Sequence, residues 1–380
     1  MDTLTDYILW MRELSFTALP FNEADALVLS MLSYFDYAPA FAASGHDRIL
    51  LRDCQGMIDE GKVRVMITGK DRGYQAFFRA AVASERYGRL ELRDYEDRYR
   101  VDPPLQFAAI TFHAPSFSYI AFRGTDNSLP GWKEDFMTGF TVTEAQQLSR
   151  EYALRTITGE GDWYLGGHSK GGNLALYAAC FLPEEQLAMI RRLYLLDGPG
   201  LCPEVMDTDR ICHVAPLTTR IVPAFSIIGS LFAPEIPDTR IVRSSAGGVT
   251  QHALISWGID HGKLALTGEK DPRSAWLSDV VARWIQGITQ EDRVIFVDEL
   301  FEALSADGAE TLDDIEEKGA GQFESILLRL FSSSEVTKKT IYDLPKRAIF
   351  GEHYEEIKQK GIGAWLLEHY LERFGNIQQN

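Results

Sequence analysis

The chain has 380 residues, of which 45% are hydrophobic and 24% are charged, and its formal net charge is −17. This length and balance are typical of a globular protein with a large core. The negative charge argues against a nucleic-acid partner, because phosphate binding requires concentrated Lys and Arg.

The four cysteines are scattered and form no CxxC pair, which favours a reducing compartment over a disulfide scaffold or a structural zinc site. The N-terminus lacks the basic-then-apolar layout of a signal peptide, and no run approaches the roughly 18 apolar residues that span a bilayer. We therefore expect a cytoplasmic protein with no integral membrane segment.

The first 90 residues are expected to be mainly helical. Asn22 precedes an apolar-periodic stretch over residues 26–32 and is a plausible N-cap, and a second helix is expected over Tyr74–Glu85. Two β-rich segments, Phe107–Phe112 and Ser118–Phe122, are separated by a short turn sequence and predict a hairpin.

The following part of the chain alternates helices with strands, which predicts parallel βαβ units and hence an α/β fold. We expect a mostly parallel central sheet covered by helices, with helical additions at both ends of the chain. Residues 1–290 are interpreted as one domain, and residues 291–380 as an acidic, helical extension packed on it. The expected helices are Trp132–Arg155 and Lys170–Leu182, and the expected strands are Asp162–Leu165, Arg192–Leu196, Thr219–Val222, Arg240–Val242 and Leu254–Gly258.

The segment Gly167-His168-Ser169-Lys170-Gly171 matches the pattern G-x-S-x-G. Its context, a strand before and an amphipathic helix after, is typical of a turn so tight that the flanking positions must lack bulk. Such a turn exposes the Ser169 hydroxyl and aims the backbone N–H of Lys170 at a developing oxyanion, near the positive end of the helix dipole. We interpret Ser169 as a nucleophile. The alternative is an unreactive serine in a glycine-rich turn, and no P-loop pattern occurs.

Phe122-Arg123-Gly124-Thr125-Asp126, followed by residues 166–172, resembles a pairing found in class 3 (fungal-type) lipases. The chain resembles more closely a bacterial family of unknown function that is related to those lipases. The resemblance spans most of residues 4–260 and implies an α/β-hydrolase fold, while it says little about the substrate. The matching segments are 14–16, 21–27, 132–136, 167–173, 197–200, 222–223, 226–229 and 251–257.

The resemblance assigns the second oxyanion-hole donor to the backbone N–H of Thr125, in the loop between a strand and a helix, and its hydroxyl is a candidate to assist. For Arg123 and Asp126 we favour a charge pair that fixes this loop.

The base is expected to follow the acid in the chain order Ser…Asp…His. Of the eight histidines, His252 and His261 flank the expected strand at Leu254–Gly258, and His252 matches the family's histidine-containing motif. We therefore expect His252 to be the general base.

The triad acid has two candidates. Class 3 lipases usually carry it beside a Val-Pro motif, but here Val222-Pro223 is followed by Ala224, Phe225 and Ser226. Asp197, at the end of the strand after the nucleophile helix, is the leading candidate, and Asp238 is the second. The alternative role for Asp197 is a turn residue before Gly198.

The apolar segment 223–236 is either a lid or acyl-pocket wall, or a buried helix packed closely at Gly229. The candidate pocket residues are Phe225, Ser226, Ile228, Leu231 and Phe232.

These residues predict an esterase- or lipase-like serine hydrolase with a Ser169–His252–Asp197 triad and a small acyl or lipid-like substrate. It would need no metal and no organic cofactor. The competing hypothesis is a degenerate hydrolase fold that serves as a binding or regulatory module.

Overall fold

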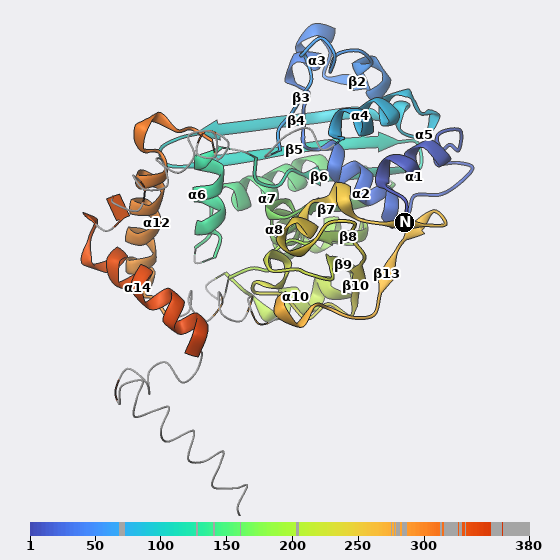
Figure 1. Ribbon diagram of the computed structural model, residues 1–380. Helices are drawn as coiled ribbons and strands as arrows, with labels where there is room; N and C mark the ends of the chain where they lie inside the picture. Colours follow the sequence, from blue (N-terminus) through green and yellow to red (C-terminus); the bar gives the residue numbers. More distant parts are fainter. Residues whose placement is uncertain are drawn as a thin grey trace, which may run out of the picture.

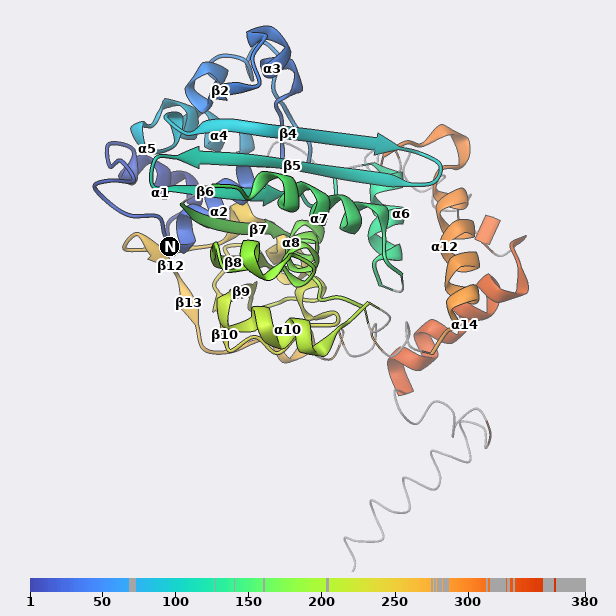
Figure 2. The same ribbon diagram turned by 180° about the vertical axis from the view of Figure 1, so that it is seen from behind.

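The computed structural model contains, within its described residues, a nine-stranded sheet with helices on both faces (Figures 1 and 2). The structure describes residues 1–67, 73–126, 128–139, 141–159, 161–202, 205–274, 276, 278, 282, 287–311, 314, 326, 329, 330, 332–350 and 359.

The strands of the large sheet follow the order β13-β10-β9-β8-β7-β6-β5-β4-β2. The five neighbouring strands from β10 to β6 are parallel, and the pairings on either side of them are antiparallel. Two small ribbons, β1 with β3 and β11 with β12, lie outside this sheet. The strands are β1 Phe35–Asp36, β2 Arg48–Leu50, β3 Arg64–Val65, β4 Glu91–Arg100, β5 Leu105–Ala114, β6 Phe117–Phe122, β7 Asp162–His168, β8 Ile190–Leu196, β9 Thr218–Pro223, β10 Asp238–Val242, β11 Ile259–Asp260, β12 Lys263–Leu264 and β13 Leu266–Thr267.

The helices divide between the two faces of the sheet. Successive side chains of a strand point to opposite faces, so β6 contributes Tyr119 to the core under α1, α2 and α4, and Ile120 to the core under α7, α8 and α10. The α-helices are α1 Leu4–Met11, α2 Glu23–Leu32, α3 Ala38–Ser44, α4 Tyr74–Ala83, α5 Glu85–Gly88, α6 Leu129–Met137, α7 Glu144–Thr156, α8 Lys170–Cys180, α9 Glu184–Leu187, α10 Thr208–Val214, α12 Gln290–Leu304 and α14 Glu335–Phe350. The 3₁₀ turns are η1 Leu51–Cys54, η2 Ala215–Leu217, η3 Ile228–Ser230, η4 Gly248–His252, η5 Leu254–Ser256 and η6 Ala306–Gly308.

The parallel strands end together at one edge of the sheet. In the register of the sheet Phe122 pairs with Gly167, His168 with Leu196, and Leu196 with Ile221. The loops that follow β6, β7, β8 and β9 therefore meet at this edge, which is where open α/β sheets carry their ligand sites.

The predicted α/β class is confirmed, together with the hairpin of β5 and β6 and the cap at Asn22. The Asn22 side chain accepts the backbone N–H of Ala24 at 2.8 Å, and α2 begins at the next residue after the cap. The parallel strands are those that carry the candidate site, while the outer strands are antiparallel.

Two expectations about single elements need correction, and one strand was missed. The predicted strand Leu254–Gly258 is instead mostly the turn η5, because local bonds such as Trp257 N–H to the Leu254 carbonyl (2.9 Å) close it on itself. The predicted helix over Trp132–Arg155 is two helices, since Thr143 caps the second. The long strand β4 was not predicted, because its sequence is rich in charge and has no apolar run.

The C-terminal segment contributes α12 and α14, as expected of a helical extension, and α12 packs against α6. Much of residues 312–380, including most of the acidic stretch 313–317, lies outside the described residues. The division at residue 290 stays a prediction.

Candidate active site

Ser169 occupies a strained turn between β7 and α8. Its backbone angles are φ 56° and ψ −129°, a conformation that costs a non-glycine residue free energy and that clusters at functional sites. A Cβ atom on Gly167 would lie 2.4 Å from the carbonyl carbon of Gly171, and one on Gly171 would lie 2.1 Å from the Phe122 carbonyl oxygen. Both positions therefore require glycine, as the G-x-S-x-G pattern predicts.

The end of β8 places a buried carboxylate beside the expected base. Asp197 is 1% exposed, and its Oδ2 lies 2.7 Å from Nδ1 of His252. Its other oxygen, Oδ1, accepts a hydrogen bond from the Ser226 hydroxyl at 2.5 Å. An imidazole that donates from Nδ1 to a carboxylate keeps Nε2 free of a proton, which is the tautomer that a general base needs.

His252 is tied to the nucleophile turn through His168, the residue before Ser169. Nε2 of His168 lies 2.8 Å from the His252 carbonyl oxygen, and the two imidazole rings lie with their centroids 4.5 Å apart. Within the described structure, Ser169 and His252 share no direct hydrogen bond. The arrangement therefore brings the His252 imidazole to the serine turn without a contact to the Ser169 hydroxyl, and catalytic hydrogen bonds are often long before substrate binds.

His168 is neutral in this position. Burial, with a smaller contribution from His252, holds the pKa of His168 well below its ordinary value. A neutral ring has one donor and one acceptor nitrogen. Nε2–H therefore donates to the His252 carbonyl, and Nδ1 accepts the Tyr34 hydroxyl at 2.9 Å.

The loop after β6 packs against the same turn. A Cβ atom on Gly124 would lie 2.6 Å from the His168 carbonyl oxygen, so the loop passes directly beside the turn that carries Ser169. The Thr125 hydroxyl donates to Oδ2 of Asp135 at 2.9 Å. This bond engages the hydroxyl proton and leaves the backbone N–H as the candidate oxyanion donor of Thr125. Burial raises the pKa of Asp135, with Lys170 and the Thr125 hydrogen bond acting against it.

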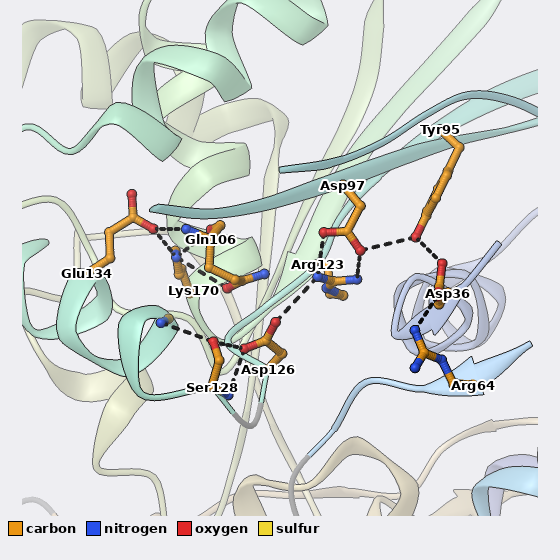
Figure 3. Close-up of polar contacts among 11 residues, drawn as sticks. Asp36, Arg64, Tyr95, Asp97, Gln106, Arg123, Asp126, Ser128, Glu134 and Lys170 are labelled. Carbon is orange, nitrogen blue, oxygen red and sulfur yellow. Dashed lines mark hydrogen bonds and ion pairs between the residues drawn. The ribbon is translucent and has the colours of Figure 1, made fainter. Parts of the chain in front are cut away.

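The expected charge pair in this loop is present. Arg123 lies 3.6 Å from Asp126 and also makes two hydrogen bonds to Asp97, at 2.9 and 3.0 Å (Figure 3). Asp126 in turn accepts the Ser128 backbone N–H at 2.9 Å, one residue before α6 begins. These contacts anchor the loop from the strand side.

A buried ion pair that sequence reasoning missed anchors the loop region from the helix side. The Lys170 ammonium is fully buried and lies 2.6 Å from Glu134 Oε2 and 2.7 Å from the Gln106 carbonyl oxygen (Figure 3). Glu134 also accepts the backbone N–H groups of Gln106 and Ala145. The side chain of Lys170 therefore ties the first residue of α8 to α6. The available signal in the sequence was a charged residue in a turn rich in glycine.

Asp238, the second candidate for the acid, lies elsewhere. It begins β10, at the opposite end from the edge where the loops meet, and its carboxylate accepts hydrogen bonds from Thr219 and Arg240. The structure brings Asp197, and not Asp238, to His252.

The predicted pocket residues separate into two groups. Ile228, Leu231 and Phe232 line an apolar cavity beside α6, while Phe225 is buried and Ser226 bonds to Asp197. The expected alternative of a buried helix is wrong, because the segment forms only the short turn η3, although it packs closely at Gly229, where a Cβ atom would lie 2.2 Å from Asp197 Oδ1. Its role as a lid or acyl-pocket wall stays a prediction.

Several other features bear on chemistry. Among the described residues, His, Cys, Asp and Glu side chains form no group of three that would suit a metal ion. None of the helices in the described part of the chain is both long and apolar enough to cross a membrane. Cys54, Cys180, Cys202 and Cys212, all within the described part of the chain, form no disulfide.

The strand order, the parallel strands that end at one edge and the serine turn between β7 and α8 define an α/β-hydrolase fold. The chain belongs to the Mbeg1-like family, whose model matches residues 81–302. Among solved structures, it is similar to one described as the crystal structure of M37 lipase, with 15% sequence identity and a TM-score of 0.32 over 55% of this chain and 70% of that chain. A search of curated proteins found no match.

Proposed function

We propose that the protein is a serine hydrolase that cleaves a carboxylic ester or a related acyl bond. The observation that carries this proposal is the Asp197–His252 hydrogen bond, held over a strained serine turn by the bond from His168. An imidazole that a carboxylate holds in place beside a serine on a strained turn can activate the serine hydroxyl for acyl transfer.

In the first half of the reaction, Nε2 of His252 takes the proton of the Ser169 hydroxyl while Oγ attacks the carbonyl carbon. The charge that develops on the carbonyl oxygen is stabilised by the backbone N–H groups of Lys170 and Thr125. Lys170 begins α8, where the first N–H groups have no partner within the helix. The intermediate collapses as the alcohol leaves with the proton from His252, and Ser169 stays acylated.

In the second half, water gives a proton to His252 and its oxygen attacks the acyl carbon. Collapse of the second intermediate releases the acid and returns the proton to Ser169. Asp197 keeps its negative charge throughout and stabilises the imidazolium that forms in each half.

The test is hydrolysis of p-nitrophenyl butyrate by the purified full chain. Ser169→Ala and His252→Ala are each expected to lower kcat by at least about 10⁴-fold, because removal of either group disables the same step. His261→Ala is the matched control, since that side chain is 94% exposed and bonds only to its neighbour Asp260 among the contacts described. Ester turnover that survives Ser169→Ala would refute the proposed mechanism.

A further inference from the structure

An apolar cavity of about 240 Å³ lies between the loops of the candidate site and helix α12. Apart from Asp135, Thr138 and Arg293, the side chains that line it are apolar, and glycine and proline backbone completes the walls. Ligand sites of this kind bury apolar groups of a substrate and leave few polar contacts to orient it.

Three segments that line the cavity adjoin the proposed catalytic groups, although Ser169, Thr125 and His252 are not among the described residues that line it. Asp135, on α6, accepts the hydroxyl of Thr125. Pro199 follows the turn of Asp197, and Ile227 follows Ser226, the hydrogen-bond partner of that carboxylate. A chain that entered this cavity would therefore begin beside the oxyanion loop.

The fourth wall comes from the C-terminal segment, where α12 contributes Phe296 and Val297. Both side chains are buried, and they belong to a small core that also includes Leu129 of α6. Figures 1 and 2 show α12 beside α6 at one end of the sheet.

The contacts between α12 and α6 hold this wall in a defined place. The rings of Phe136 and Phe301 meet edge to face with centroids 5.7 Å apart, and the Lys133 ammonium lies 2.7 Å from Asp298. The backbone N–H of Leu129 donates to the Glu310 carbonyl at 2.9 Å, just beyond α12. The far wall is thus fixed to the helix that carries Asp135.

We infer that this cavity binds the acyl chain of the substrate and that α12, through Phe296 and Val297, limits the length of that chain. The inference rests on the proposed function. An engineered cavity of about 150 Å³ in another protein accepts benzene, which has six carbons. By the same density, this cavity holds roughly eight to ten carbons, so the substrate is a medium-chain acyl ester.

The test compares p-nitrophenyl esters from acetate to palmitate as substrates of the full chain. Each methylene that enters an apolar site contributes about 0.8 kcal/mol, so kcat/KM is expected to rise about fourfold per methylene until the cavity is full. Val297→Trp should lower the ratio of kcat/KM for decanoate to that for acetate by at least tenfold, because the indole occupies the cavity. Phe296→Ala should move the optimum to longer chains.

Val294→Trp is the matched control, because Val294 is 41% exposed on α12 and does not line the cavity. It should leave the ratio within about twofold of the wild-type value. Circular dichroism and thermal unfolding establish whether each variant is folded. If Val297→Trp does not fold, the inference is tested with Phe296→Ala alone.

A decanoate-to-acetate ratio that is unchanged in folded Val297→Trp, or that changes equally in Val294→Trp, would overturn the inference. If no ester is hydrolysed, the proposed function fails, and binding of decanoic acid measured by calorimetry still tests the cavity. Binding by the wild-type chain that is lost in Val297→Trp supports the inference. No binding to the wild-type chain overturns it.

Discussion

The replacement Asp197→Asn tests whether the buried carboxylate is the triad acid. It keeps the shape of a side chain that is 1% exposed and removes only its charge. The asparagine would face the Ser226 hydroxyl on one side and Nδ1 of His252 on the other. If its NH₂ faces the ring, Nδ1 must accept and Nε2 carries the proton. If the asparagine oxygen faces the ring instead, Nδ1 still donates to it, but the imidazolium that forms during the reaction has no negative charge beside it.

In the first orientation the variant loses the free Nε2 that would take the Ser169 proton, and in the second it loses the charge that would stabilise the imidazolium. In a triad, an Asp→Asn change of this kind costs about 10⁴-fold in kcat, or about 5.5 kcal/mol of transition-state stabilisation. The cost to folding should be much smaller, because the side chain keeps its volume and both neighbours keep a hydrogen-bond partner.

The assay measures kcat and KM for p-nitrophenyl butyrate, with urea unfolding in parallel. Asp238→Asn is the matched control, since that carboxylate bonds to Thr219 and Arg240 at the other end of the sheet, and its kcat should stay within about threefold of the wild-type value. A kcat for Asp197→Asn within tenfold of the wild-type value, in a folded protein, would show that Asp197 is not the acid.

Three further predictions concern the groups around the triad. Lys170→Met should lower the free energy of unfolding by about 3–5 kcal/mol, because it leaves Glu134 buried without its partner; a loss under 1 kcal/mol in urea unfolding contradicts this. Because the folded protein holds His168 neutral while the unfolded chain binds a proton near pH 6.5, stability should fall as the pH drops below that value, by up to about 1.4 kcal/mol per unit. His168→Gln should flatten that slope, and an equally steep slope in the variant refutes the assignment. Ser226→Ala should lower kcat by at least about tenfold, since a hydrogen bond to a charged group contributes about 1.5–3 kcal/mol, and an unchanged kcat would remove Ser226 from the site.

The parts of the fold that could be predicted from sequence are those with local signals. The glycine spacing around Ser169 determines a turn that no other residue type allows, and the alternation of strands and helices determines the parallel sheet. The cap at Asn22 is likewise a matter of a few neighbouring residues.

The rest depends on contacts between segments distant in the sequence. Glu134 becomes the partner of Lys170, and Asp135 that of Thr125, only because α6 folds back over the start of α8. The cavity wall on α12 depends on packing between residues near 130 and residues near 297. A local sequence pattern does not predict a contact between segments so far apart. The strand β4 has no apolar pattern in its sequence, because its backbone pairing with β5 holds it in the sheet.

The most direct test of the central claim, that Ser169 is an activated nucleophile, is labelling with a fluorophosphonate probe followed by peptide mapping. We expect one modified residue, Ser169, with labelling abolished in Ser169→Ala, strongly slowed in His252→Ala and unchanged in His261→Ala. Absence of labelling in the folded wild-type chain, while a known serine hydrolase in the same tube is labelled, would contradict it and would favour a binding or regulatory role for this fold.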